Sequence, residues 1–195
     1  MTILVDGTDP YPWPYDGRLG GDHLALVLAG WDEGWAERSL GTGAAAPSAA
    51  ALAGAVAARG GLVVVLAHRG SDPLPLDVPA TLIDAPAIDG FYASPLDDLL
   101  RRTGRTHLLV AGHGIEGPVH STLRSANDRG YECLLVLDAC SSLTDDLVEA
   151  SAKQVTMSGG IFGANGTTGA VLRALAEPDP SDPVPHLVPS TPQET

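Results

Sequence analysis

The sequence has little cysteine, little positive charge and no long hydrophobic run. Two cysteines, Cys133 and Cys140, are too few for a disulfide framework, and their spacing matches no zinc motif. A formal net charge of −13 argues against partners with a phosphate backbone or an anionic membrane surface. The apolar runs are only as long as a strand, and the N-terminus lacks the pattern of a signal peptide. We therefore expect a cytoplasmic protein that binds neither nucleic acid nor membrane.

Lysine is nearly absent as well. Lys153 is the single lysine of the chain, and it falls in the helical pattern of residues 144–157, where a solvated surface charge is expected. The glycine spacings match neither a P-loop nor the dinucleotide-binding fingerprint. The sequence therefore predicts no nucleotide site and no cofactor.

What the chain does contain is a regular alternation of strand and helix patterns. Continuous apolar runs are typical of strands that are buried on both faces. They predict strands at 24–30, 61–67, 80–84, 106–112 and 132–138. Helical patterns, several with Pro at the start or Gly at the end, fall between them. They predict helices at 47–59, 95–104, 118–129, 144–157 and 167–176.

This alternation predicts an α/β fold, a three-layer Rossmann-like parallel sheet of about six strands with helices on both faces. We expect an extended N-terminal arm at 1–23, a single domain at 24–177, and a disordered Pro-rich tail at 178–195. In such a sheet, ligands bind at the carboxyl ends of the strands. Candidate site residues are therefore sought where strands end.

Two stretches carry a family resemblance: "STLRSANDRGYECLLVLDAC" and "MSGGIFGANGTTGAVLRAL". They resemble the isochorismatase-like cysteine hydrolase superfamily. The N-terminal "DPYPWPYDG" and the stretch "ANDRGYECLL" look most like biuret hydrolases and carbamoylsarcosine hydrolase-like members. The resemblance implies the isochorismatase-like hydrolase fold and assembly into dimers or tetramers.

The resemblance also implies a catalytic trio, which this sequence lacks. Family members use an Asp that ends the first strand, a Lys before a Phe, and a Cys that opens the helix after the fourth strand. A thiol at a helix N-terminus is favoured as thiolate, and the Asp takes its proton. The matching positions here are Gly30, Ala85 and Pro118. Pro is tolerated at the first position of a helix, so Pro118 removes the nucleophile and is still compatible with the fold.

Other polar residues fall near the same strand ends. Candidates for acid–base chemistry are Asp32, His113, Glu116 and His120, and candidates for substrate binding are these four together with Trp31 and Tyr92. Trp35 maps to the same rim. The alternative is that these residues are ordinary loop residues of an acidic protein. His68, His113 and His120 are scattered over strand ends with no ligand spacing, so no metal site is predicted.

Two expectations concern the shape of the cleft. The segment "HRGSDPLPLDVPA" is shorter than in biuret hydrolase-like relatives, where longer excursions cover the pocket, so we expect a more open cleft. The resemblance also implies a cis peptide before the catalytic position, which would map to the bond between His113 and Gly114.

Three functional hypotheses follow. The first is a catalytically degenerate family member that acts by binding, as a homo-oligomer, as a partner of an active paralogue, or on a small molecule. The second is a repurposed enzyme, in a specialised bacterial pathway, that acts on a small polar or carbonyl compound. The third is an amide hydrolase with relocated groups, for which Cys140 and Asp32 are the available thiol and acid.

Overall fold

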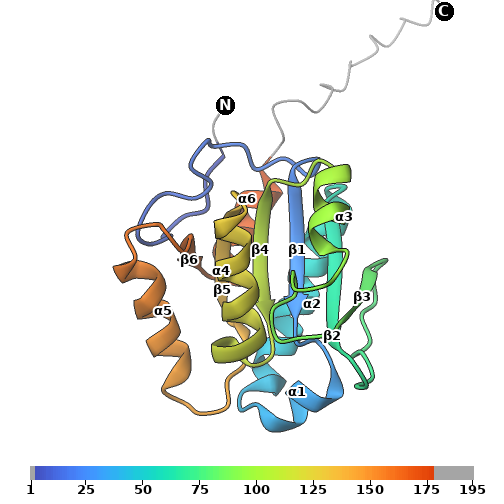
Figure 1. Ribbon diagram of the computed structural model, residues 1–195. Helices are drawn as coiled ribbons and strands as arrows, with labels where there is room; N and C mark the ends of the chain where they lie inside the picture. The colour runs from blue at the N-terminus through green and yellow to red at the C-terminus, as the bar shows by residue number, and fades with distance from the viewer. Residues whose placement is uncertain (1–2, 178–195) are drawn as a thin grey trace, which may run out of the picture.

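A six-stranded parallel sheet forms the centre of the computed structural model, which describes residues 3–177 (Figure 1). The strand order is β3-β2-β1-β4-β5-β6, and every neighbouring pair is parallel. The strands are β1 (Leu24–Ala29), β2 (Leu62–His68), β3 (Thr81–Ala85), β4 (His107–Gly112), β5 (Glu132–Cys140) and β6 (Ala164–Gly166). The predicted three-layer α/β fold is confirmed.

Helices cover both faces of this sheet. Helices α2 and α6 pack together on one face, and α4 and α5 pack on the other, against β5 and its neighbours (Figure 1). The helices are α1 (Glu33–Arg38), α2 (Thr42–Ala58), α3 (Leu96–Arg102), α4 (His120–Asp128), α5 (Leu147–Met157) and α6 (Thr168–Ala176), with a π-helix, η1, at Ile115–Val119. Since both faces are covered, β1 and β4 are buried at every position, as their continuous apolar sequences indicate.

The strand order reverses direction between β1 and β4. From β1 the chain proceeds outward to β2 and β3, and then returns to the other side of β1 with β4, β5 and β6. Loops that leave the carboxyl ends of β1 and β4 therefore diverge, which leaves a crevice at that edge of the sheet. Gly30, after β1, and His113, after β4, both lie there.

The structure differs from the predicted elements at α1, β6, α2 and η1. Helix α1 and strand β6 were not predicted, because both are too short for a clear periodicity. Helix α2 begins at Thr42 and has Pro47 inside it, rather than at its start. Pro118 is likewise not the first residue of an α-helix: it lies inside η1, and α4 begins only at His120.

The N-terminal arm lies across the amino edge of the sheet. Val5 pairs with Trp13, and Asp9 pairs with Asn165 of β6, each in an antiparallel bridge. The side chain of Trp13 is fully buried and belongs to the main hydrophobic core. The predicted tail, 178–195, lies outside the described residues. Within residues 3–177, none of the helices has the length and apolar character needed to cross a bilayer.

Candidate functional site

The crevice at the carboxyl edge contains one small pocket. Gly30, Ala85 and Pro118 all line it, although they are far apart in the sequence: Gly30 follows β1, Ala85 is the last residue of β3, and Pro118 lies after β4. Its other lining residues are Ala29, Trp35, Leu66, His68, Ala87, Ile88, Gly90 and Thr122. The cavity volume is about 10 Å³, which is space for about one water molecule. The pocket as folded is therefore very small.

Gly30 and Pro118 fill the centre of the pocket together. Gly30 has a φ of +62°, a left-handed conformation that side chains rarely adopt. A Cβ atom at this position would lie 2.6 Å from the carbonyl oxygen of His113 and 3.1 Å from Cγ of Pro118. The pocket as folded therefore has no room for a side chain at position 30.

Trp35 closes the remaining space. Its buried ring lies against the backbone of Gly114 and Gly117, where Cβ atoms would come within 2.4 Å and 3.0 Å of it. The guanidinium of Arg38 covers the ring at 4.3 Å from the centroid. The expectation of a more open cleft is therefore wrong: the short loops are accompanied by a tryptophan that packs where an open cleft would be.

The loop between β4 and α4 has an unusual backbone. Gly114 adopts a φ of +71°, and the amide of Val119 donates to its carbonyl at 3.4 Å, which is the five-residue spacing of a π-helix. The expected cis bond between His113 and Gly114 is not found. In the described chain, the cis peptides are Asp9–Pro10 and Trp13–Pro14.

Asp32 does not line this pocket. Its side chain is fully buried, and each carboxylate oxygen accepts a backbone hydrogen bond, one from Trp35 at 3.0 Å and one from His68 at 2.8 Å. The first bond caps the N-terminus of α1, and the second joins α1 to the end of β2. Asp32 thus holds α1, and with it Trp35, against the sheet.

His113 is also separated from the pocket. Its ring stacks on Trp31 with centroids 4.8 Å apart, and its Nδ1 is 2.7 Å from the hydroxyl of Ser141. Burial lowers the pKa of His113 to about 4, despite the opposing effect of the Asp32 charge. The imidazole is therefore neutral at physiological pH and serves as part of the packing.

Glu116 and His120 share a second pocket, between η1, α4 and α5, with a volume of about 270 Å³. Nδ1 of His120 accepts a hydrogen bond from Arg124 at 3.1 Å, and Glu116 accepts one from the amide of Leu143 at 3.2 Å. Burial and the neighbouring Arg124 charge lower the pKa of His120. Of the residues expected to face one cleft, the structure thus brings Glu116 and His120 together and leaves His113 apart.

The other predicted residues lie elsewhere. Tyr92 has 64% of its surface exposed and lines neither pocket, and Trp31 is buried beneath His113. Cys140 is buried, its thiol donates to the carbonyl of Val136 at 3.2 Å, and burial raises its pKa to about 12. Such a thiol is inert as a nucleophile.

A polar cluster that was not predicted lies at the opposite edge of the sheet. Asp16 of the arm, His107 at the start of β4 and Glu132 at the start of β5 bring their side chains together. Burial alone would lower the pKa of His107, but the hydrogen bond to Glu132 and the charge of Asp16 outweigh it and raise the pKa. The sequence signal available was that His107 and Glu132 both lie at the start of a predicted strand, whereas the register that places them side by side is seen only in the structure. His68, His113 and His120 form no such group within the described residues.

Comparison with known proteins agrees with this architecture. Residues 25–167 match the model of the isochorismatase domain. The fold is similar to a cysteine hydrolase from Pseudomonas syringae pv. phaseolicola 1448A, with a TM-score of 0.72 and 17% identity over 81% of this chain and 94% of that one. It is similar to the MAR1 ribonuclease from Caenorhabditis elegans, with a TM-score of 0.73 and 19% identity over 90% of this chain and 100% of that one. It is also similar to the nicotinamidase SaPncA from Staphylococcus aureus, with a TM-score of 0.65 and 17% identity over 71% of this chain and 96% of that one.

These structural similarities, at such low identity, support the fold and not the reaction. The domain match covers most of the chain, from the second residue of β1 to the residue that caps α6. The chain belongs to the isochorismatase family.

Proposed function

We propose that this chain is a non-hydrolytic member of the isochorismatase family that acts by binding, as a subunit that assembles with itself or with a catalytically intact relative. One observation carries the proposal. The pocket at the carboxyl edge is lined by Gly30, Ala85 and Pro118, and its volume is that of about one water molecule.

The chemistry of the pocket lining supports this proposal. Cysteine-dependent hydrolysis requires a thiolate, a proton acceptor and a charge-balancing group around the scissile bond. In the described lining, His68 is the single titratable side chain, and no thiol, carboxylate or amine is present. The hydroxyl oxygen of Thr122 accepts a hydrogen bond from the amide of Gly90 at 3.0 Å.

Groups elsewhere in the fold do not replace the missing ones. The Cys140 thiol is buried and protonated, and both oxygens of Asp32 are held by backbone amides. Lys153 lies on the exposed side of α5, where it pairs with Glu149 at 2.6 Å. Among the described residues, Cys140, Asp32 and Lys153 therefore do not come together as a relocated catalytic site, which argues against the alternative of an amide hydrolase.

A candidate surface for assembly lies along β3 and the loop that follows it. Strand β3 is an edge of the sheet, with unpaired backbone groups on its outer side. Leu82, Ile88 and Tyr92 present large apolar side chains there, with exposed fractions of 56%, 48% and 64%. Apolar side chains beside an open strand edge favour a second chain as the occupant.

The absence of hydrolysis can be tested by measuring ammonia release from a panel of small amides and ureas that includes nicotinamide and biuret. We expect no release above that of heat-inactivated protein. Ammonia release from any compound of the panel would overturn the proposal. If a folded Cys140→Ser variant loses that release, Cys140 is the relocated nucleophile.

Assembly can be tested by sedimentation velocity over a range of protein concentrations. We expect an oligomer that dissociates when Leu82→Lys and Tyr92→Ser are combined. Ile161→Ser, which alters an exposed apolar residue after α5, is the matched control. A monomer at every concentration, with no co-purification of an intact isochorismatase-family paralogue, would contradict a partner role.

A second candidate function is favoured by the pocket between η1, α4 and α5. Its volume of about 270 Å³ would admit a small polar or carbonyl compound, and Oε2 of Glu116 is buried there without a hydrogen-bond partner. A repurposed enzyme would use Glu116 and His120 at this place. This function is tested by measuring the melting temperature of the wild type and of Glu116→Gln in the presence of small carbonyl compounds. A compound that stabilises the wild type and not the variant supports the function. The absence of any stabilising compound contradicts it.

A further inference from the structure

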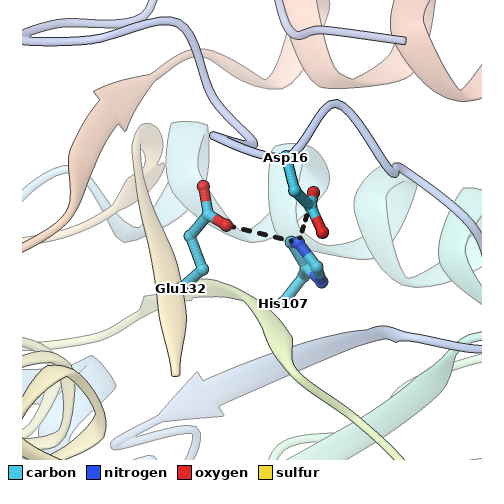
Figure 2. Close-up of side chains that lie close together, drawn as sticks. All are labelled: Asp16, His107 and Glu132. Carbon is cyan, nitrogen blue, oxygen red and sulfur yellow. Dashed lines mark hydrogen bonds and ion pairs between the residues drawn. The ribbon is translucent and has the colours of Figure 1, made fainter. Parts of the chain in front are cut away.

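The cluster of Asp16, His107 and Glu132 joins three segments that are distant in the sequence (Figure 2). His107 and Glu132 are the first residues of β4 and β5 and are paired in the parallel register, so their side chains lie on the same face of the sheet. Asp16 reaches them from the N-terminal arm. The cluster lies at the amino edge of the sheet, at the other end of the strands from the pocket lined by Gly30 and Pro118.

The distances within the cluster suit a single bound cation. Nε2 of His107 is 3.1 Å from Oδ1 of Asp16 and 3.3 Å from Oε2 of Glu132, and the potential ligand atoms all lie within 4.8 Å of one another. Ligands that bind one zinc ion with bonds of about 2.0–2.2 Å at tetrahedral angles are separated by about 3.4 Å. A cation can thus be accommodated with small side-chain movements.

The surroundings orient the imidazole for this role. Nδ1 of His107 is 2.9 Å from the hydroxyl of Thr106, a partner that can accept its proton. With the proton on Nδ1, Nε2 directs its lone pair between the two carboxylates, which is the arrangement of a metal-binding histidine and its supporting hydrogen bond. The fully buried Trp13 packs edge-on against the ring, 6.0 Å between centroids, and supplies an apolar wall.

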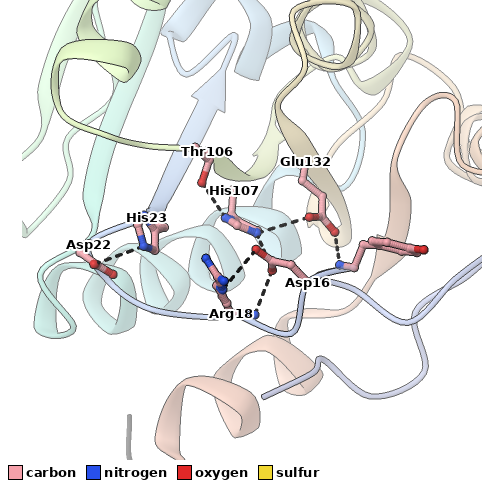
Figure 3. A network of polar contacts seen from close by, with 8 residues as sticks. Asp16, Arg18, Asp22, His23, Thr106, His107 and Glu132 are labelled. Carbon is pink, nitrogen blue, oxygen red and sulfur yellow. Dashed lines mark hydrogen bonds and ion pairs between the residues drawn. The ribbon is translucent and has the colours of Figure 1, made fainter. Parts of the chain in front are cut away.

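The carboxylates are held in place as well. Oε1 of Glu132 accepts a hydrogen bond from the amide of Tyr15, and Oδ1 of Asp16 accepts one from the amide of Arg18 at 3.0 Å (Figure 3). Exposure rises from 5% of the His107 side chain to 22% for Glu132 and 40% for Asp16. Backbone amides of the N-terminal arm therefore hold both carboxylates, and the cluster is open to water on the side of Asp16.

The electrostatics require a positive charge at this point. Two carboxylates converge on one ring nitrogen in a chain of net charge −13. The exposed Arg18 guanidinium lies 4.0 Å from the outer oxygen of Asp16, and a cation or a proton between the carboxylates would relieve the repulsion that remains. A proton on Nε2 can form only one strong hydrogen bond, which the two carboxylates must share. A metal ion can form a separate coordination bond to each carboxylate. One nitrogen and two oxygen donors fit zinc; calcium and magnesium require more oxygen ligands.

We propose that Asp16, His107 and Glu132 bind one divalent transition-metal ion, zinc being the best fit, with water in the remaining coordination position. The ion fastens the N-terminal arm to the first residues of β4 and β5. The site lies at the other edge of the sheet from the pocket lined by Gly30, Ala85 and Pro118.

The test is calorimetric titration of zinc into the chelator-treated full chain at pH 7.5, with thermal unfolding measured in parallel. We expect one equivalent to bind, with a rise in the melting temperature. His107→Gln and Glu132→Gln should each weaken binding at least tenfold. His23→Gln is the matched control, because this neighbouring histidine pairs with Asp22 outside the cluster and should leave binding unchanged.

Glu132→Gln and Asp16→Asn keep the size of the side chain, so they report on the site even if His107→Gln fails to fold. A second readout is cobalt substitution, which should give the visible absorption of a tetrahedral nitrogen–oxygen site that Glu132→Gln removes. The proposal is overturned if zinc does not bind, or if it binds equally to the wild type and to the folded cluster variants. In that case a protonated His107 supplies the positive charge.

Discussion

The space beside Gly30 is occupied by the ring of Pro118. A Cβ atom at position 30 would lie 3.1 Å from Pro118 Cγ and 2.6 Å from the His113 carbonyl oxygen. The two residues follow different strands and meet at the centre of the pocket. Each therefore limits what the other position can accept.

Gly30→Ala should be strongly destabilising. The positive φ and the close contacts together should reduce the free energy of unfolding by about 2–4 kcal/mol, measured by urea denaturation. Gly70→Ala is the control, since Gly70 has a φ of +85° but no atom within 4 Å of the added Cβ, and about 1 kcal/mol is expected. Equal losses in the two variants would mean that the pocket can accept a side chain at position 30.

Trp35→Ala should cost about 3–5 kcal/mol in the free energy of unfolding, because the ring is buried against Gly114 and Gly117 and no neighbour can fill its place. Trp35→Phe should cost less, because a smaller aromatic ring still covers these glycines. A loss below about 1 kcal/mol in Trp35→Ala would show that the ring does not fill the cleft.

Asp32→Ala should behave as a structural and not a catalytic change. It leaves the amides of Trp35 and His68 without their acceptor in a buried place, and about 2–5 kcal/mol should be lost from the free energy of unfolding. Thr167→Ala, which removes the N-cap of α6, is the comparison, with about 1 kcal/mol expected. The measurement is chemical denaturation, and a cost for Asp32→Ala no greater than that of Thr167→Ala would contradict the role.

His113 should make stability depend on pH. Its pKa is about 4 in the folded chain and about 6.5 when unfolded, so the unfolded state binds more protons between these values. The contribution of His113 to stability should fall as the pH decreases from about 7 to 4, by at most about 1.4 kcal/mol per unit, and this contribution should level off below pH 4.

The pH effect of His113 is isolated by comparing urea denaturation of the wild type and of His113→Gln between pH 5 and 7.5. The variant should lose stability less steeply on acidification. Ser141→Ala removes the partner of Nδ1 but keeps the buried imidazole, so it should retain the wild-type slope. Identical slopes in wild type and His113→Gln would show that His113 is accessible to protons in the folded state.

Much of the architecture could be predicted from local patterns. The apolar runs that became β1, β2, β4 and β5 were found to within a few residues, because a buried parallel strand needs continuous apolarity. The short elements α1 and β6 were missed, since a helix of 6 residues and a strand of 3 carry little periodic signal. The turn at Pro118 was misread because a π-helix and the first turn of an α-helix accept the same residues.

The sequence by itself determined the parallel sheet and the residue types at positions 30, 85 and 118. Both depend on the order of residue types along the chain, which sets strand burial and the available chemical groups. Only the tertiary structure decided that Trp35 fills the crevice, that His113 stacks on Trp31, and that Asp16 meets His107 and Glu132. These contacts join residues that are distant in sequence, and they depend on shape and register between elements, which no local pattern encodes.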